Sequence, residues 1–193
     1  MCYNYNRKEG QLLKFKEIEQ ISHRIVKNID GIESLAVYEV SGKSLRLLKD
    51  MIEFWDTVFG HSALDEFGFV PLLRHGNVYL LTNENKNTVL GMASFMRDWS
   101  DPKMAYLFDY AIAEELQGMS LGYEFLTILI RDLADLGFET LQLTVDVNNK
   151  PALRLYSDKI GFNPVRMSMN EYGENEDRYI MELNIEEYLK ENE

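Results

Sequence analysis

The segment with the clearest chemical content covers residues 110–122, YAIAEELQGMSLG. A chain that leaves a strand and enters a helix through small residues exposes backbone N–H groups, and with the helix dipole these can bind a phosphate or diphosphate. Gly118 and Gly122 carry no Cβ, so a ligand could approach the backbone closely. Ser120 could cap the helix or donate its hydroxyl to an anion. The same residues also suit an ordinary strand–turn–helix connection, in which the glycines only serve the turn.

A second segment, residues 147–162 (VNNKPALRLYSDKIGF), combines a helix start with a tyrosine that could reach a ligand. Asn149 and Pro151 are typical of the first residues of a helix. Ala152 and Tyr156 are four residues apart and therefore lie on one side of that helix. Tyr156 could aim its phenol at a ligand on the sheet. The alternative is that Asn149 only caps the helix and Tyr156 only fills the core.

Hydrophobic periodicity predicts the elements that hold these segments. Strands are expected over residues 35–40, 77–82, 88–96, 104–112, 141–147, 162–167 and 178–183, and helices over 45–58, 120–136 and 151–159. An apolar stripe over residues 11–29 predicts a further helix. Within 104–112, alternation places Tyr106, Phe108 and Tyr110 on one face. The order predicts an α/β (α+β) fold with a mixed central sheet of about six to seven strands, flanked by helices and preceded by an extra N-terminal helix.

Together the two segments resemble the GNAT superfamily of N-acetyltransferases. That family carries a Q/R-x-x-G-x-G/A turn after its fourth strand, and the matching residues are Gln117, Gly118, Met119, Ser120, Leu121 and Gly122. It also carries an N-x-x-A-x-x-x-Y stretch ending in G-F, matched by Asn149, Ala152, Tyr156, Gly161 and Phe162. The resemblance implies an acetyltransferase domain over residues 35–184. Residues 1–34 would then be a helical extension and 185–193 an acidic tail.

The resemblance implies acetyl-CoA as the acetyl donor and no metal. The turn would wrap the diphosphate, and a bulge near Tyr110–Ile112 would free backbone N–H groups for the ligand. One of these, from Tyr110 or Ile112, would stabilise the oxyanion. The residues expected to bind acetyl-CoA are Tyr110, Ala111, Ile112, Gln117, Gly118, Met119, Ser120, Leu121, Gly122, Asn149 and Ala152.

The resemblance implies one catalytic side chain, and position on the expected strands suggests a second. Tyr156 is the candidate general acid for the leaving sulfur, although full proton transfer from a phenol (pKa ~10) to a thiolate (~8.5) is uphill by roughly 2 kcal/mol. Asp109 is the candidate base, and Asp146 is an alternative. Either carboxylate could instead be a solvated surface group. Ser120 replaces a usual glycine, and binding weakens if its φ is positive.

The acid-rich stretch 170–177 resembles the hairpin of ribosomal-protein N-terminal acetyltransferases of this superfamily. Those enzymes place a glutamate base at the position of Thr144. Threonine cannot serve as that base, so the narrower assignment does not carry over to this chain.

Composition limits the partners. The 20 basic and 32 acidic residues give a net charge of −12, which disfavours nucleic acid and favours a cationic amine. The single cysteine cannot form an internal disulfide, the polar start does not resemble a signal peptide, and no apolar run suits a bilayer. We therefore expect a cytoplasmic protein without a membrane partner. The N-terminal helix could dock on the domain, cover the acceptor groove or join a second subunit, so a homodimer stays open.

The predicted function is transfer of an acetyl group from acetyl-CoA to a primary amine of a small molecule, peptide or protein. The alternative is a non-catalytic acyl-CoA-binding or sensing domain that keeps the donor site. Turnover with an added amine separates these two hypotheses.

Overall fold

A computed structural model of the 193-residue chain describes residues 23–29, 35–40, 48–60, 64–83 and 88–192. Its centre is one eight-stranded sheet with the strand order β1-β2-β3-β4-β5-β6-β8-β7. Neighbouring strands are antiparallel except β5 and β6, which are parallel. The expected mixed α/β sheet flanked by helices is therefore confirmed.

The strands are β1 (His23–Ile29), β2 (Leu35–Val40), β3 (Asn77–Asn83), β4 (Thr88–Arg97), β5 (Met104–Ile112), β6 (Thr140–Asp146), β7 (Asn163–Ser168) and β8 (Arg178–Asn184). The helices are α1 (Leu48–Phe59), α2 (Glu66–His75), α3 (Leu121–Asp135), α4 (Lys150–Leu153) and α5 (Ile185–Glu191). A 3₁₀ turn, η5 (Glu114–Leu116), precedes α3, and a π-helical segment, η6 (Arg154–Ile160), continues α4.

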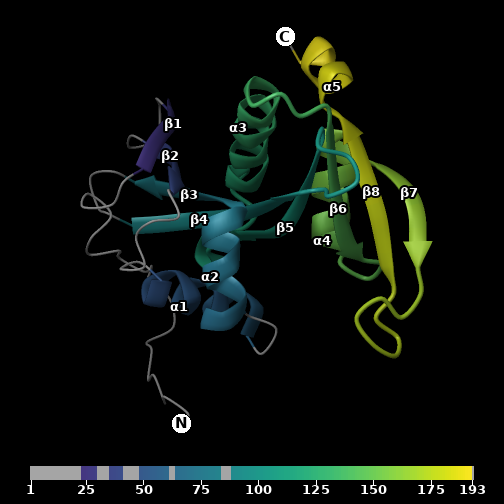
Figure 1. Cartoon of the computed structure of the whole chain (residues 1–193), viewed down its shortest axis with the longest axis horizontal. Coiled ribbons are helices and arrows are strands. Elements are labelled where there is room, and N and C mark those ends of the chain that lie inside the picture. Colours follow the sequence, from purple (N-terminus) through teal and green to yellow (C-terminus); the bar gives the residue numbers. More distant parts are fainter. Residues whose placement is uncertain (1–22, 30–34, 41–47, 61–63, 84–87, 193) are drawn as a thin grey trace.

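The helices form two layers, one on each face of the sheet (Figure 1). α3 covers one face, where Phe125, Leu129 and Leu133 are buried at intervals of four residues, and η6 and α5 pack beside it. α1 and α2 cover the other face with Trp55 and Phe69. Each fully buried side chain of this size contributes about 2–3 kcal/mol. The two layers hold the sheet from both sides and fix the strand ends where the site lies.

The N-terminal prediction is wrong in part. The helix expected over residues 11–29 is a strand over His23–Ile29, and residues 11–22 lie outside the described part of the chain. β1 pairs with the edge of β2, which otherwise would leave backbone groups unpaired. Ile25, Val26 and Ile29 are β-branched and suit a strand as well as an apolar helical stripe. β1 brings the sheet to eight strands.

Two helices were not expected. α2 begins at Asp65, whose carboxylate accepts a hydrogen bond from the Gly68 N–H at 3.1 Å. α5 occupies most of the segment expected as an acidic tail, with Asn184 as its cap. Ile185 and Tyr188 of α5 are buried, so this segment packs on the domain instead of extending into solvent.

β5 carries a bulge that reorganises its faces. Ser94 of β4 pairs with Asp109 while its neighbour Phe95 pairs with Leu107, so Phe108 is the extra residue. The bulge was expected near Tyr110–Ile112 and lies two residues before Tyr110, at Phe108. It also overturns the expected common face, because Tyr110 now packs in the α3 layer and Phe108 in the α1 layer.

β5 and β6 separate after the bulge. Their pairing ends at Leu107 and Leu143, although both strands continue. Beyond that point β5 pairs only with β4, and β6 only with β8, among the described strands. The opening between β5 and β6 is the place where the two sequence motifs meet.

Candidate active site

The open edge of β5 presents backbone donors to the gap. The Ala113 N–H donates to the Leu90 carbonyl of β4 at 2.9 Å. Because successive N–H groups of a strand point to opposite edges, those of Tyr110 and Ile112 point away from β4 and toward the gap. The two N–H groups expected to stabilise an oxyanion are therefore available, although the bulge that frees them lies earlier in the strand.

The loop over residues 117–122 has the backbone geometry of an anion receptor. Gly118 has φ +81°, which favours glycine. No described residue accepts from the N–H groups of Gly118, Ser120, Leu121, Gly122 and Tyr123. These N–H groups surround the N-terminus of α3, where the helix dipole is positive. They line or border a first cavity of about 640 Å³, whose wall includes Gln117, Gly118, Ser120, Gly122, Asn149 and Tyr156.

The protein's own packing leaves room for a Cβ at Gly122. A Cβ there would lie 3.5 Å from Ile112 and 3.7 Å from the Tyr110 hydroxyl, both ordinary contacts. Gly122 nevertheless lines the first cavity. The residues therefore fit a diphosphate that approaches the backbone more closely than a side chain would allow.

Ser120 has a left-handed backbone conformation, with φ 63° and ψ −2°. For a residue with a Cβ this conformation costs about 1–2 kcal/mol. Its side chain makes no capping hydrogen bond, so the helix-cap role considered for it is wrong. Because φ is positive, we expect the chain with Ser120 to bind acetyl-CoA more weakly than it would with glycine at this position.

The Tyr110 side chain joins β5 to the start of α3. Its hydroxyl donates to the Gly122 carbonyl, and its ring stacks on Phe125 with 5.6 Å between centroids. Gln117 Nε2 donates to the Ile112 carbonyl at 3.2 Å, which ties the same loop to the strand. Both side chains thus hold the loop against the strand.

Three other residues that were expected to bind acetyl-CoA contact the first cavity little or not at all. Ala111 is buried against the α1 layer although it borders the first cavity. Met119 is 64% exposed, and Leu121 packs on the α3 core. Neither Met119 nor Leu121 is among the described residues that line the first cavity. Leu121 can still offer its backbone N–H.

Asn149 and Ala152 are placed by the turn into α4. Asn149 Oδ1 accepts from the Ala152 N–H at 3.1 Å, so the side chain of Asn149 is a helix cap. Both residues also line the first cavity and a second cavity of about 630 Å³. The cap and the ligand-lining position are therefore compatible.

Tyr156 lies between the two cavities and lines both. It is 8% exposed and packs edge-to-face on Phe162 with 5.7 Å between ring centroids. No described residue hydrogen-bonds its hydroxyl. Burial, with a smaller contribution from the negative charge of Asp109, raises the pKa of Tyr156 above 10.0. Tyr156 thus places at the junction of the cavities a protonated hydroxyl that has no partner among the residues the structure describes.

Asp109 lines the second cavity beside the bulge. Trp55 of α1 donates its Nε1–H to Asp109 Oδ2 at 2.8 Å. Burial raises the pKa of Asp109 from 3.8 to about 6, and the hydrogen bond from Trp55 opposes that rise. A carboxyl group with this pKa is mostly ionised at pH 7 and can accept a proton. The geometry therefore favours Asp109 over Asp146 as the base.

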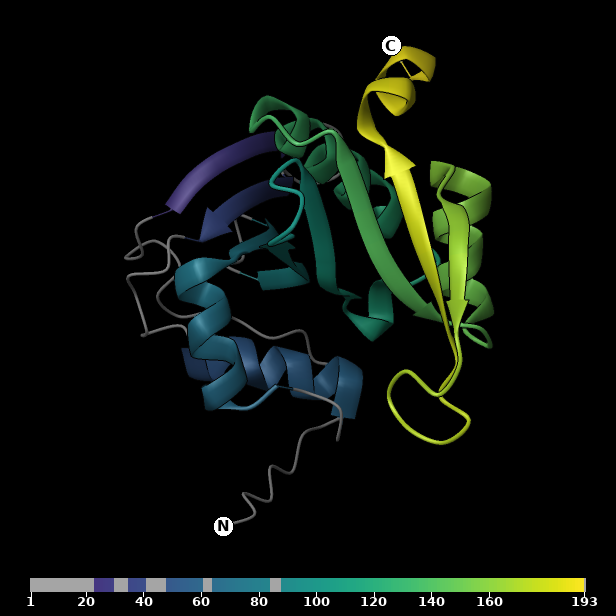
Figure 2. The same ribbon diagram turned by 45° about the vertical axis from the view of Figure 1, so that its right-hand side comes forward.

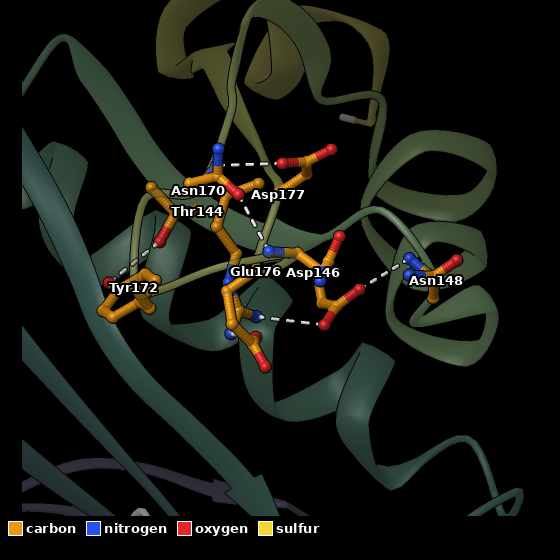
Figure 3. A network of polar contacts seen from close by, with 9 residues as sticks. Thr144, Asp146, Asn148, Asn170, Tyr172, Glu176 and Asp177 are labelled. Atoms are coloured by element: carbon orange, nitrogen blue, oxygen red, sulfur yellow. Dashed lines mark hydrogen bonds and ion pairs between the residues drawn. The ribbon is translucent and has the colours of Figure 1, made fainter.

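Both carboxylate oxygens of Asp146 contact other residues of the protein. Its Oδ1 accepts from the Asn148 N–H at 2.7 Å, and its Oδ2 lies 3.8 Å from Arg178 (Figure 3). Thr144 beside it exchanges a hydrogen bond of 2.9 Å with Tyr106, and Tyr172 of the β7–β8 loop reaches the same Thr144 oxygen at 3.5 Å. Thr144 is thus part of a hydroxyl network.

Three contributors to the site were not predicted: Trp55, Tyr172 and Arg178. The helix expected over residues 45–58 accounts for the buried ring of Trp55 but says nothing of its N–H donor. The acid-rich hairpin was noticed, but only its pairing on β6 brings Tyr172 and Arg178 over the second cavity. No pattern along the chain signals either contact.

The family model for the acetyltransferase (GNAT) family matches residues 45–162. The chain belongs to the GNAT acetyltransferase family. A comparison with curated proteins finds no match. The ribosomal-protein-S18-alanine N-acetyltransferase from Escherichia coli is 26% identical, with a TM-score of 0.64 over 77% of this chain and 94% of that chain. The spermidine/spermine N-acetyltransferase from Vibrio cholerae is 17% identical, with a TM-score of 0.65 over 82% and 97%.

A third structure, an IAA acetyltransferase from Bacillus cereus, is 16% identical, with a TM-score of 0.62 over 78% of this chain and 99% of that chain. The two less similar structures show that this GNAT chain shares their fold. Within the described ranges no group of three His, Cys, Asp or Glu residues could hold a metal ion. The helices described here are all too short or too polar to cross a membrane.

Proposed function

We propose that this GNAT protein transfers the acetyl group of acetyl-CoA to a primary amine by direct attack of the amine on the thioester. The observation that carries the proposal is that two cavities meet at Tyr110, Asn149, Ala152 and Tyr156. The first lies at the N–H-rich start of α3, and the second contains Asp109 with its raised pKa. A donor in the first cavity and an amine in the second would place their reacting groups at the junction.

The proton of the attacking ammonium goes to Asp109, directly or through water. The neutral nitrogen forms a bond to the thioester carbon, and the carbonyl oxygen accepts hydrogen bonds from the N–H groups of Tyr110 or Ile112 as it becomes negative. Loss of one such donor typically costs about 3–4 kcal/mol of the barrier. The carbon–sulfur bond then breaks as the carbonyl re-forms, the nitrogen gives up its second proton, and the thiolate takes up a proton and leaves as coenzyme A.

Tyr156 stabilises the leaving sulfur by donating a hydrogen bond. Because its pKa is raised, full transfer of its proton to a thiolate is uphill by more than the roughly 2 kcal/mol expected for a free phenol. The hydroxyl therefore acts as a donor to the sulfur, or passes on a proton that comes from the amine. This role requires a hydroxyl that is not already hydrogen-bonded to the protein. No described residue hydrogen-bonds the hydroxyl of Tyr156.

The donor and acceptor assignments rest on different evidence. The family and the N–H groups of Gly118 and residues 120–123 support acetyl-CoA. Two matched structures are named for amine acceptors, the S18 alanine and spermidine/spermine, which supports an amine for this chain. The net charge of −12 supports an acceptor that is cationic before it reacts.

A continuous assay of coenzyme A release with a panel of primary amines tests this function. The proposal expects release that depends on one added amine and that saturates with acetyl-CoA. Binding of acetyl-CoA without turnover across the panel would favour the non-catalytic acyl-CoA-binding alternative.

A further inference from the structure

We propose that Arg178 makes this site selective for an acceptor with a single ammonium group and an uncharged, apolar body, against diamines. The inference rests on the proposed function, since it concerns the acceptor in the second cavity. It comes from the distribution of charge over the wall of that cavity. Figure 3 shows the part of this wall near β6 and the β7–β8 loop.

Three carboxylates line the second cavity: Asp109, Asp146 and Glu176. Taken together they would suit an acceptor with more than one positive charge. Arg178 is the one cation among the described residues of this wall. The placement of this guanidinium therefore decides which carboxylates an ammonium group can reach without meeting a charge of its own sign.

Arg178 is held against two of the three. One end nitrogen lies 3.1 Å from Glu176, and the other lies 3.8 Å from Asp146. The guanidinium group also packs over the Tyr172 ring, 4.8 Å from its centroid, and its side chain is only 24% exposed. The other carboxylate oxygen of Asp146 accepts a hydrogen bond from the Asn148 N–H. A second ammonium at this end would have to approach a guanidinium of the same sign.

Asp109 differs from these two carboxylates. Its partner is the neutral Trp55 indole, which occupies only Oδ2. Within the described residues of the cavity no cation is paired with it. One ammonium group can therefore be accommodated at Asp109, next to the Tyr156 junction, and this is the ammonium that reacts.

The rest of the wall is apolar. Phe59, Leu64 and Phe108 line the cavity and are half-buried, so each still has surface for an acceptor to cover. Covering apolar surface contributes about 25 cal/mol per Å². An alkyl or aryl body attached to the ammonium would use this surface, whereas a second ammonium would have to leave water without an unoccupied carboxylate.

Pentylamine and cadaverine test the inference because they differ only by the second amino group. We expect the wild-type kcat/KM for pentylamine to exceed that for cadaverine by about 10-fold, which corresponds to about 1.4 kcal/mol. Phenethylamine should be accepted at least as well as pentylamine. In Arg178→Met, kcat/KM for cadaverine should rise, so that the ratio of kcat/KM for pentylamine to that for cadaverine falls below about 2-fold. Arg178→Lys should keep the wild-type preference for pentylamine.

Arg166→Met is the matched control, since Arg166 is an exposed cation of β7 that lines neither cavity. It should leave the ratio unchanged, and melting temperatures of all variants show whether they are folded. Equal or better use of cadaverine by the wild type, or an unchanged ratio in folded Arg178→Met, would overturn the inference but leave the acetyltransferase function intact. Turnover of no amine by the wild type would overturn both.

Discussion

Replacing Asp109 with asparagine should stabilise the protein while it removes most of the activity. The carboxyl group is half-buried, and burial raises its pKa from 3.8 to about 6. Asparagine is nearly the same size and can still accept the hydrogen bond from Trp55, but it carries no charge to bury. Stability and activity are thus expected to change in opposite directions at one residue.

The size of the stabilisation follows from the raised pKa. A rise from 3.8 to about 6 corresponds to about 3 kcal/mol of unfavourable free energy in the ionised form, and residual solvent access reduces this to about 2 kcal/mol. The cost of the carboxylate is absent well below pH 3.8, where the group is protonated in both states. It grows as the pH rises from 3.8 to about 6 and is nearly complete above that pH. The stabilising effect of Asp109→Asn should therefore shrink as the pH falls below 6.

Urea unfolding of the wild type and Asp109→Asn at pH 7.5 and 4.5 measures this effect, and amine-dependent coenzyme A release at pH 7.5 measures activity. We expect kcat to fall by about 100-fold or more, as for loss of a general base. Asp146→Asn is the matched control, because it removes an ion-paired carboxylate and should destabilise by up to about 1 kcal/mol. Destabilisation by Asp109→Asn at pH 7.5, or wild-type kcat in that variant, would refute the assignment of Asp109.

Three further variants test other parts of the site. Trp55→Phe should raise the pKa of the proposed base and move the acid limb of the kcat/KM profile to higher pH. Tyr79→Phe removes a comparable buried hydrogen bond to a carboxylate, of 2.7 Å, and should leave that limb in place. Tyr156→Phe should lower kcat more than it raises the KM for acetyl-CoA, whereas Tyr110→Phe, which loosens the start of α3, should mainly raise that KM. Ser120→Gly should raise stability by about 0.5–1 kcal/mol and tighten coenzyme A binding by calorimetry; weaker binding would show that the hydroxyl matters more than its strained backbone.

Most elements after residue 35 could be predicted from the sequence because their apolar spacing is unambiguous. β5, α3 and β6 carry clear periods, and the sheet they form has few alternatives. The stripe over residues 11–29 was misread because its β-branched residues suit a helix and a strand alike. Pairing with β2, which no local pattern encodes, decides for a strand over His23–Ile29.

The donor side of the site could be predicted and the acceptor side only partly. Residues 117–122 are contiguous, so their motif and their geometry coincide. Asp109 could be named but not chosen over Asp146, since the choice depends on Trp55 and Arg178, which lie 54 and 32 residues away along the chain from their respective carboxylates. The domain boundaries, the cytoplasmic location and a homodimer stay predictions.

The central claim is that one chain brings acetyl-CoA and an amine together and transfers the acetyl group. Its most direct test is to mix the purified protein with acetyl-CoA and a primary amine and to follow both products, free coenzyme A by thiol titration and the acetylated amine by mass spectrometry. The account predicts equal amounts of the two, formed only when the amine is present and strongly reduced in Asp109→Asn. Coenzyme A released at the same rate without any amine, or acetyl-CoA bound and left intact with every amine, would contradict it.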